Sequence, residues 1–380
     1  MTSIIWQSFS INIHIMRAFG LYPPEKPTRI SWLRSLLLYF AFAYPVPVLG
    51  SLHFIYGEEI DQMRIGENAF QVAHLASQIA KLMPFILNGD RIKKCIHYLE
   101  DPLFEVKGDN EKILEKWVHT CQRNTKVFLG SIIAGNISWA VKPFLLQNGQ
   151  LSVDVWLPYN LMENTMVYIF VFVLLTLGVA YGSIAGAAID PLLAGLCGLA
   201  SGHIQVLKHN LKHLDQCTTD SESLKIFVTR RNIKHCINHH NIILSFIKEF
   251  ESCFSSVVFS QFAGSVLVVG FCCFQLGKMS PTTPNFSILV CYLIVLLVQI
   301  YFYCYYGTVL YEESDSLTNA DYMGNWYDYD AESKRDFILL LERSQRPIVV
   351  TAGKILDLSV ITFTTILRRS YSLLALLKNQ

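Results

Sequence analysis

The sequence predicts an all-α membrane protein with seven transmembrane helices, a cytoplasmic N-terminus and an extracellular C-terminus. Hydrophobic residues make up 52% of the 380 residues and charged residues only 16%, unlike the composition of an average soluble domain. Seven apolar stretches each hold the roughly 20 residues that a helix needs to cross a bilayer. Lys and Arg gather on one side of these stretches, and positive charge stays in the cytoplasm.

The predicted spans cover residues 31–56, 68–88, 127–146, 163–187, 252–276, 286–306 and 347–377. The N-terminal arm and the loops on its side carry most of the 31 Lys and Arg residues, whereas the opposite side holds only Arg64, Lys278 and Lys378. This asymmetry gives the reverse of the orientation of a G-protein-coupled receptor. The net charge of +1 gives no reason to expect nucleic acid as a partner.

The cytoplasmic connections are long and are predicted to be helical. Leucines recur at helical spacing from Leu192 to Leu214, which extends the fourth span into the cytosol. A separate helix over 331–346 carries apolar residues on one face and ends at Pro347, because proline breaks a helix. These apolar faces lie too far from the bilayer to be covered by lipid. They pack within the subunit or form a cytoplasmic platform for oligomerisation.

The last span is the most polar of the seven. Ionisable groups at membrane depth are costly and normally face protein or water. The helix is therefore either buried in the bundle or lines a water-filled pathway, and the spread of polar positions over several faces favours the pathway. Helical spacing places one set of residues on a single face: Thr362, Ile366, Arg369, Leu373 and Leu377.

Histidine pairs on the cytoplasmic side suggest a metalloenzyme as an alternative. His209 and His213 share a helix face, as do His235 and His239, and such pairs can ligate one metal. Membrane desaturases and hydroxylases use boxes of this kind but need more histidines than this chain supplies. Carboxylate pairs for catalysis, phosphate-binding loops and nucleophile elbows are also missing. We therefore predict no enzymatic activity, no cofactor and no bound metal.

Three stretches near the C-terminus resemble the insect odorant receptor family. They are Tyr306-Gly307 with Ser314, Ala320-Asp321-Tyr322 and Trp326; Glu342-Arg343-Ser344-Gln345-Arg346-Pro347 with Thr351-Ala352-Gly353-Lys354; and Ser370-Tyr371-Ser372. Gustatory receptors share this architecture and are the alternative, but their Thr-Tyr…Gln-Phe motif is absent here. The shared co-receptor of the family is longer, so the chain resembles a tuning, odour-binding subunit.

The resemblance implies an odorant-gated, non-selective cation channel that forms a heterotetramer with the co-receptor and requires no G protein. Its expected partners are a small volatile organic ligand and membrane lipid, and its expected location is the plasma membrane of a sensory dendrite or cilium. Residues 1–330 would form the odorant-binding bundle and its cytoplasmic helices, and 331–380 an anchor helix and a pore-lining helix. Leu373 and Leu377 would form the gate. The subunit anchor would use Phe337, Leu340 and Leu341.

The resemblance also places odorant binding in the outer half of spans two to six. A small volatile ligand needs an apolar, aromatic cavity with a few polar groups. The pair Gly135 and Trp139 matches the spacing of pocket residues in the family. The full candidate set is Phe70, His74, Ser77, Ile132, Gly135, Trp139, Tyr168, Ile169, Phe172, Phe259, Phe262, Leu289, Tyr292 and Leu296.

Overall fold

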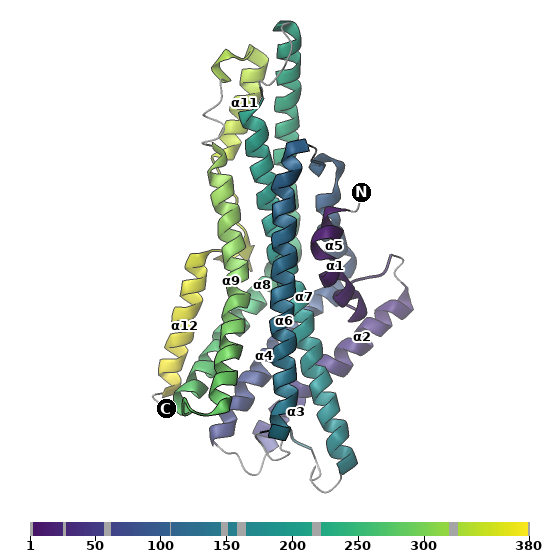
Figure 1. Ribbon diagram of the computed structural model, residues 1–380, viewed down its shortest axis with the longest axis vertical. Coiled ribbons are helices and arrows are strands. Elements are labelled where there is room, and N and C mark those ends of the chain that lie inside the picture. Colours follow the sequence, from purple (N-terminus) through teal and green to yellow (C-terminus); the bar gives the residue numbers. More distant parts are fainter. Residues whose placement is uncertain are drawn as a thin grey trace.

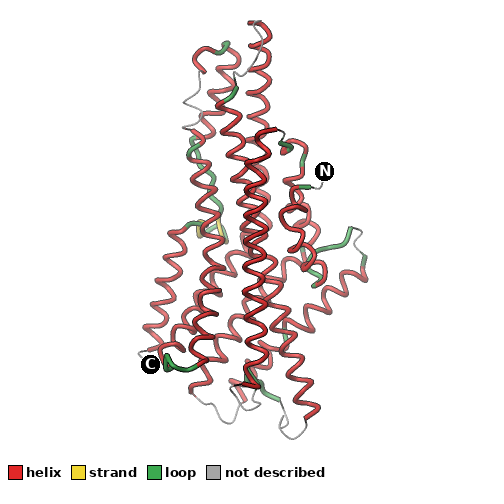
Figure 2. The backbone as a smooth tube through the Cα atoms, viewed as in Figure 1, coloured by secondary structure: helices red, strands yellow, loops and turns green. Residues whose placement is uncertain are grey.

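Long helices run side by side along one axis of the molecule (Figures 1 and 2). The computed structural model describes residues 3–25, 28–56, 62–106, 108–145, 151–157, 165–214, 222–318 and 326–378. Apart from one short hairpin, the regular structure of these residues is helical (Figure 2). The prediction of an all-α fold is confirmed.

The N-terminal part of the chain begins with helix α1 (Ile4–Ala18), which packs against α7 through fully buried apolar residues such as Ile5 and Phe9. The first predicted span consists of two helices, α2 (Arg29–Ala43) and α3 (Pro45–Tyr56). They separate at Tyr44 because a proline follows and cannot continue the hydrogen-bond ladder. Helix α4 (Gln62–Leu87) is the second span, and the short α5 (Gly89–Ile96) follows it.

Three helices continue well beyond a bilayer. Helix α6 (Glu111–Leu145) is the third span, and three short 3-10 helices precede it: η1 (His97–Glu100), η2 (Pro102–Phe104) and η3 (Gly108–Asn110). Helix α7 (Thr165–Lys212) has 48 residues and α8 (Glu222–Lys278) has 57, against the roughly 20 that cross a membrane. The predicted cytoplasmic extension of the fourth span is therefore confirmed.

The sixth span and the last cytoplasmic segment complete the upper end of the molecule. Helix α9 (Pro284–Asp315) is followed by η5 (Trp326–Asp328) and α11 (Ala331–Ser344), which lies beside the extended ends of α7 and α8 (Figure 1). Asp330 caps α11, and its carboxylate also pairs with Arg230 of α8, Oδ2 to Nη2 at 2.9 Å. Hydrogen bonds from Ser333 and Arg230 lower the pKa of Asp330 to about 2.

The predicted seventh span over 347–377 is wrong in its first third. The chain there forms an antiparallel hairpin of β1 (Thr351–Ala352) and β2 (Leu356–Asp357), and helix α12 (Val360–Lys378) begins only afterwards. The turn places Gly353 at φ 62° and Lys354 at φ 58°, in the left-handed region that a helix cannot contain. The hairpin lies partway along the bundle, at the upper end of α12 (Figure 1).

In the described part of the chain, five helical segments are long and apolar enough to cross a membrane: Arg29–Tyr56, Glu111–Phe144, Thr165–Lys212, Ser223–Lys278 and Pro284–Asp315. The other two predicted spans correspond to α4 and α12, and both pack along α8.

The predicted orientation can be tested directly at the two termini. Because the basic loops belong to the end that carries α11, the opposite end with α12's C-terminus should face outward. An epitope tag after Gln380 should bind antibody on intact cells, whereas a tag before Met1 should bind only after permeabilisation. The reverse staining pattern would contradict the topology.

Candidate functional site

An apolar and aromatic cluster joins α4, α8 and α9 in the outer half of the bundle. We call it the outer cluster: buried Phe70, Val268, Cys272, Leu289 and Leu296, with Tyr292 packed against them. The ring centroids of Phe70 and Tyr292 are 5.4 Å apart. The His74 ring meets Tyr292 edge-on at 5.7 Å. Two groups that can form hydrogen bonds therefore adjoin an apolar cluster, the composition that a site for small organic molecules needs.

A second aromatic group lies on the other side of α4, around Trp139 of α6. Trp139 packs in a cluster with Tyr168 and Phe172 of α7, whose rings are parallel at 6.4 Å. The Trp139 Nε1 donates to Gln71 Oε1 of α4 at 3.3 Å. Residues 151–157 fold against this group, and Ser152 Oγ donates to the Trp139 carbonyl at 3.1 Å. Helix α4 thus contacts both aromatic groups.

The structure brings together eight of the fourteen candidate ligand residues in these two groups: Phe70, His74, Leu289, Tyr292 and Leu296 in and beside the outer cluster, and Trp139, Tyr168 and Phe172 around the tryptophan. Ser77 lies where α4 and α8 approach closely, since a Cβ on Gly264 would be 2.5 Å from Ser77 Cβ. Phe262 is deeper, with its ring 6.1 Å from Tyr303. Ile132 is half-buried on α6.

Three candidates face away from these groups, and the expectation that they line a cavity is corrected. Gly135 is exposed, and a Cβ there would meet no atom within 4 Å, so this glycine opens no space beside Trp139. Ile169 is 49% exposed on α7. Phe259 packs under the hairpin, where a Cβ on Gly353 would be 2.7 Å from its ring. Spacing along a helix groups residues on a face but does not show which neighbour that face meets.

The predicted pore face of α12 is also corrected. Thr362 and Ile366 are buried at 8% and 4% exposure against their own subunit, whereas Arg369 is exposed. Ser370 of the same buried side donates to the Val266 carbonyl of α8 at 3.3 Å. The exposed stripe consists instead of Ile361, Thr365, Arg368 and Ser372. Leu373 and Leu377 belong to α12, but their side chains lie outside the described residues.

The predicted anchor residues lie inside the subunit rather than on its surface. Phe337, Leu340 and Leu341 are buried in a cluster with the extended ends of α7 and α8. The Phe337 ring stacks on Trp326 at 6.3 Å. The outward apolar residues of α11 are Ile338 and Leu339, at 49% and 56% exposure. The periodicity identified an apolar face correctly, but this face covers the core of its own chain.

A buried polar network, none of whose members is a predicted site residue, lies just inward of the outer cluster. Lys81 of α4 forms an ion pair with Asp190 of α7, and both side chains have no exposed surface. Lys81 Nζ also donates to Gln261 Oε1 of α8 at 3.1 Å. Gln299 and Tyr303 of α9 donate to Asp190 Oδ2 and Oδ1, each at 2.5 Å. Part of the signal was present, because Lys81 lies within the second predicted span, where an ionisable group needs a partner or water.

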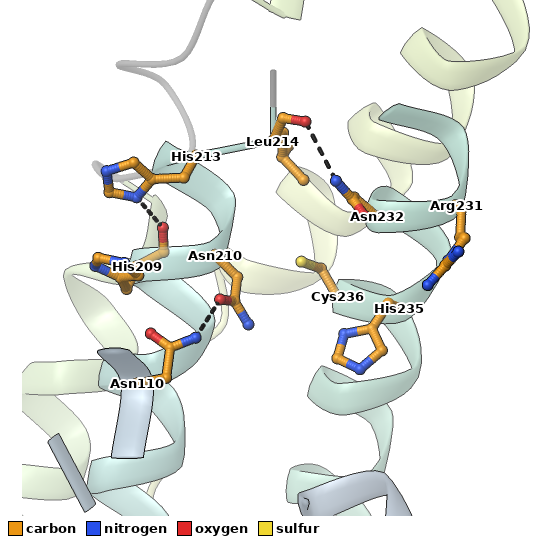
Figure 3. A pocket seen from close by; sticks show the side chains of 9 residues that line it. All are labelled: Asn110, His209, Asn210, His213, Leu214, Arg231, Asn232, His235 and Cys236. Atoms are coloured by element: carbon orange, nitrogen blue, oxygen red, sulfur yellow. Dashed lines mark hydrogen bonds between the residues drawn. The ribbon is translucent and has the colours of Figure 1, made fainter. Parts of the chain in front are cut away.

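The cytoplasmic histidines do not form a metal centre. His209, His213 and His235 line a cavity of about 340 Å³ between the ends of α7 and α8, together with asparagines and Arg231 (Figure 3). The rings of His209, in α7, and His213, just after it, are tilted with their centroids 4.2 Å apart, and His213 Nδ1 donates to the His209 carbonyl at 2.7 Å. Within the described ranges, no group of three or more His, Cys, Asp or Glu residues could hold a metal ion.

The structure is thus a bundle of long membrane helices with an aromatic, weakly polar cluster in its outer half. The family model described as 7tm Odorant receptor matches residues 63–371. The chain belongs to the odorant receptor family. The resemblance noted in its C-terminal motifs is thereby confirmed, and the family of receptors replaces the metalloenzyme alternative.

Individual relatives are similar over nearly the whole chain. Odorant receptor Or1 of Anopheles gambiae is 24% identical over 98% of this chain and 95% of its own length. Odorant receptor 22c of Drosophila melanogaster is 25% identical over 87% of this chain and 88% of its own. The solved structure of the insect olfactory receptor OR5 from Machilis hrabei has the same fold, with a TM-score of 0.81 at 16% identity over 97% of this chain and 96% of that one. Its complex with eugenol gives a TM-score of 0.82 at 15% identity over 98% and 97%.

Proposed function

We propose that the chain is a tuning subunit of an odorant-gated, non-selective cation channel that assembles with the shared co-receptor of the family. The observation that carries the proposal is the outer cluster, which α8 and α9 connect to the hairpin and α12. A binding region and a polar final helix in one bundle are what a ligand-gated pore needs. By family resemblance the complex would be a heterotetramer in the plasma membrane of a sensory dendrite or cilium.

The outer cluster supports a small volatile ligand with an aromatic or apolar body and one polar group. The rings of Phe70 and Tyr292 offer faces for stacking, while the Tyr292 hydroxyl and the His74 ring offer hydrogen bonds. The bound eugenol in the OR5 complex has this chemistry, a phenol with an apolar tail. We therefore propose phenols, aromatic alcohols and aromatic aldehydes as the first compounds to test.

The exposed stripe of α12 is the proposed pore surface, and Leu373 and Leu377 remain the proposed gate by family resemblance alone. Thr365 and Ser372 on this stripe offer hydroxyls to a hydrated pathway. Arg368 on the same stripe is long enough to turn its charge aside from a passing cation. The outward residues Ile338 and Leu339 of α11 are the proposed contact with the neighbouring subunit.

Replacing Tyr292 tests the ligand site. In cells that express the chain with the co-receptor, Tyr292→Leu should raise the half-maximal concentration of the active compound about tenfold or more, because it removes a ring contact and the hydroxyl. The active compound is chosen from a panel of eugenol, benzaldehyde, 2-phenylethanol and pentyl acetate. We call the one that evokes the largest current from the wild type the reference agonist.

Tyr311→Leu is the matched control, since Tyr311 lies on the same helix at 43% exposure, near its cytoplasmic end. It should respond like the wild type. Equal responses of Tyr292→Leu and the wild type would place the ligand site elsewhere. A wild-type chain that gives no current with any volatile compound would contradict the proposed function itself.

A further inference from the structure

The buried polar network occupies the level between the outer cluster and the inner end of α12, where that helix starts. Along α4, Lys81 lies seven residues inward of His74, which corresponds to about 10 Å on the helix axis. Along α9, the residues of the outer cluster and of the network follow one another on a single face: Leu289, Tyr292, Leu296, Gln299 and Tyr303. A displacement of α9 at the outer cluster must therefore pass the network.

On its inner side the network adjoins the contact between α9 and the start of α12. Gly307 is one turn beyond Tyr303, and a Cβ there would lie 2.2 Å from the Leu358 carbonyl oxygen. The next residue, Thr308, accepts the Val360 N–H on its Oγ1 at 3.0 Å, at the first turn of α12. A shift of α9 on the cytoplasmic side of Tyr303 would therefore act on the start of α12 through these two contacts.

Helix α8 makes a parallel connection. Its Gln261 belongs to the network, and one to three turns further inward Ser255 and Glu251 bind the hairpin. Ser255 Oγ donates to the Thr351 carbonyl at 2.9 Å, and Glu251 Oε1 accepts from the Thr351 N–H and hydroxyl, each at 2.7 Å. Both helices that carry the outer cluster therefore also carry a residue of the network, between that cluster and their contacts with the hairpin or the start of α12.

We propose that the Lys81–Asp190 ion pair is the pivot on which α9 turns, so that displacement at the outer cluster becomes displacement at the start of α12. This inference rests on the proposed function. Lys81, Asp190, Gln299 and Tyr303 are then positioning residues, which act on gating without touching the odorant. The pair links α4 to α7, and both carboxylate oxygens of Asp190 accept hydrogen bonds from α9. At this one height along the bundle, α9 is therefore held to the other two helices.

The chemistry of the pair suits a fixed point. Breaking a buried ion pair leaves an uncompensated charge in a medium of low dielectric constant, so its partners hold their geometry while apolar contacts above and below can slide. Hydrogen bonds to a charged group are also stronger than those between neutral groups. A purely structural role would stabilise the bundle without linking ligand occupancy to the pore.

Tyr303→Phe separates these roles, because it removes one hydroxyl that donates to Asp190 and leaves both charges paired. We expect normal surface expression and an unchanged half-saturating concentration of the reference agonist in thermal-shift titrations of purified protein. The maximal current per surface receptor should fall about tenfold, the change expected from losing a hydrogen bond to a charged group. Gln299→Leu should act in the same direction.

Tyr39→Phe is the matched control. Tyr39 is also buried, at 2% exposure, and its hydroxyl donates to the Ile79 carbonyl at 2.7 Å instead of to a residue of the network. It should keep the wild-type current per surface receptor. If Tyr39→Phe and Tyr303→Phe lose the same fraction of current, or if agonist affinity falls together with current, the network has only a structural role and the proposal is overturned.

Exchange of the charges tests the pair itself. Lys81→Met and Asp190→Asn each leave one charge unpaired and should lose agonist-evoked current. The exchange Lys81→Asp with Asp190→Lys should restore part of it, since the amides of Gln261 and Gln299 can reverse their orientation to suit. A double variant that folds and binds the reference agonist, yet conducts no better than the single variants, would also overturn the proposal. If the wild type conducts normally in these experiments, the proposed function stands whichever result is found.

Discussion

Gly307→Val should nearly abolish odorant-evoked current. A Cβ at this position would lie 2.2 Å from the Leu358 carbonyl oxygen and 2.8 Å from its carbonyl carbon, and backbone atoms cannot rotate aside as the end of a side chain can. Helix α9 must therefore move away from the start of α12, at the contact that we propose transmits gating. Overpacking at well-packed sites costs about 1–3 kcal/mol, which corresponds to an effect of roughly 5- to 150-fold.

The measurement is current per surface receptor with the reference agonist. Gly130→Val is the control, because a Cβ at Gly130 would meet no atom within 4 Å. The same change in helix propensity is introduced there without the clash. Wild-type currents from Gly307→Val would show that the close approach of α9 to Leu358 is not needed for gating.

Leu341→Asp should prevent the cytoplasmic end of the subunit from folding. Leu341 is 8% exposed and packs in the cluster with Phe337 and the ends of α7 and α8. A carboxylate buried there without a partner costs several kcal/mol. We expect little monodisperse protein in detergent and no surface expression. Thermal unfolding of whatever is recovered should begin well below that of the wild type.

Leu339→Asp is the informative companion, because Leu339 lies on the same helix at 56% exposure. The subunit should fold normally, but less of it should co-purify with the co-receptor if this surface is the contact between subunits. Normal co-purification of Leu339→Asp would remove this face of α11 from the proposed interface. Normal folding of Leu341→Asp would contradict the observed packing.

Most of the architecture could be predicted from the sequence, since bilayer thickness and backbone hydrogen bonding leave few options for long apolar segments. The helical extension of the fourth span followed from the leucine spacing between Leu192 and Leu214, and α7 confirms it. The hairpin before α12 could not be predicted from hydropathy, because its residues are apolar enough to continue a helix. The helix is interrupted instead by the left-handed backbone of the turn at Gly353 and Lys354.

The site was harder to predict because periodicity gives the phase of a helix but not its neighbours. Thr362 and Ile366 share a face as expected, yet that face meets α8 and α9 instead of facing outward. Phe337, Leu340 and Leu341 were likewise correctly placed on one apolar helix face. That face packs on the ends of α7 and α8 in the same subunit, whereas the prediction assigned it to a neighbouring subunit. Lys81 lies within the second predicted span and signalled a buried partner, but Asp190 lies three residues beyond the predicted end of the fourth span, so the pair itself was not evident.

Recording from excised outside-out membrane patches tests the central claim most directly. The patches should contain the chain with the co-receptor, and the pipette solution should lack nucleotides, so that no G-protein cascade can operate. The account predicts that the reference agonist opens a cation current within the patch, and that Tyr292→Leu requires about ten times more agonist for the same response. A current that disappears on excision and returns only when GTP is supplied would contradict it.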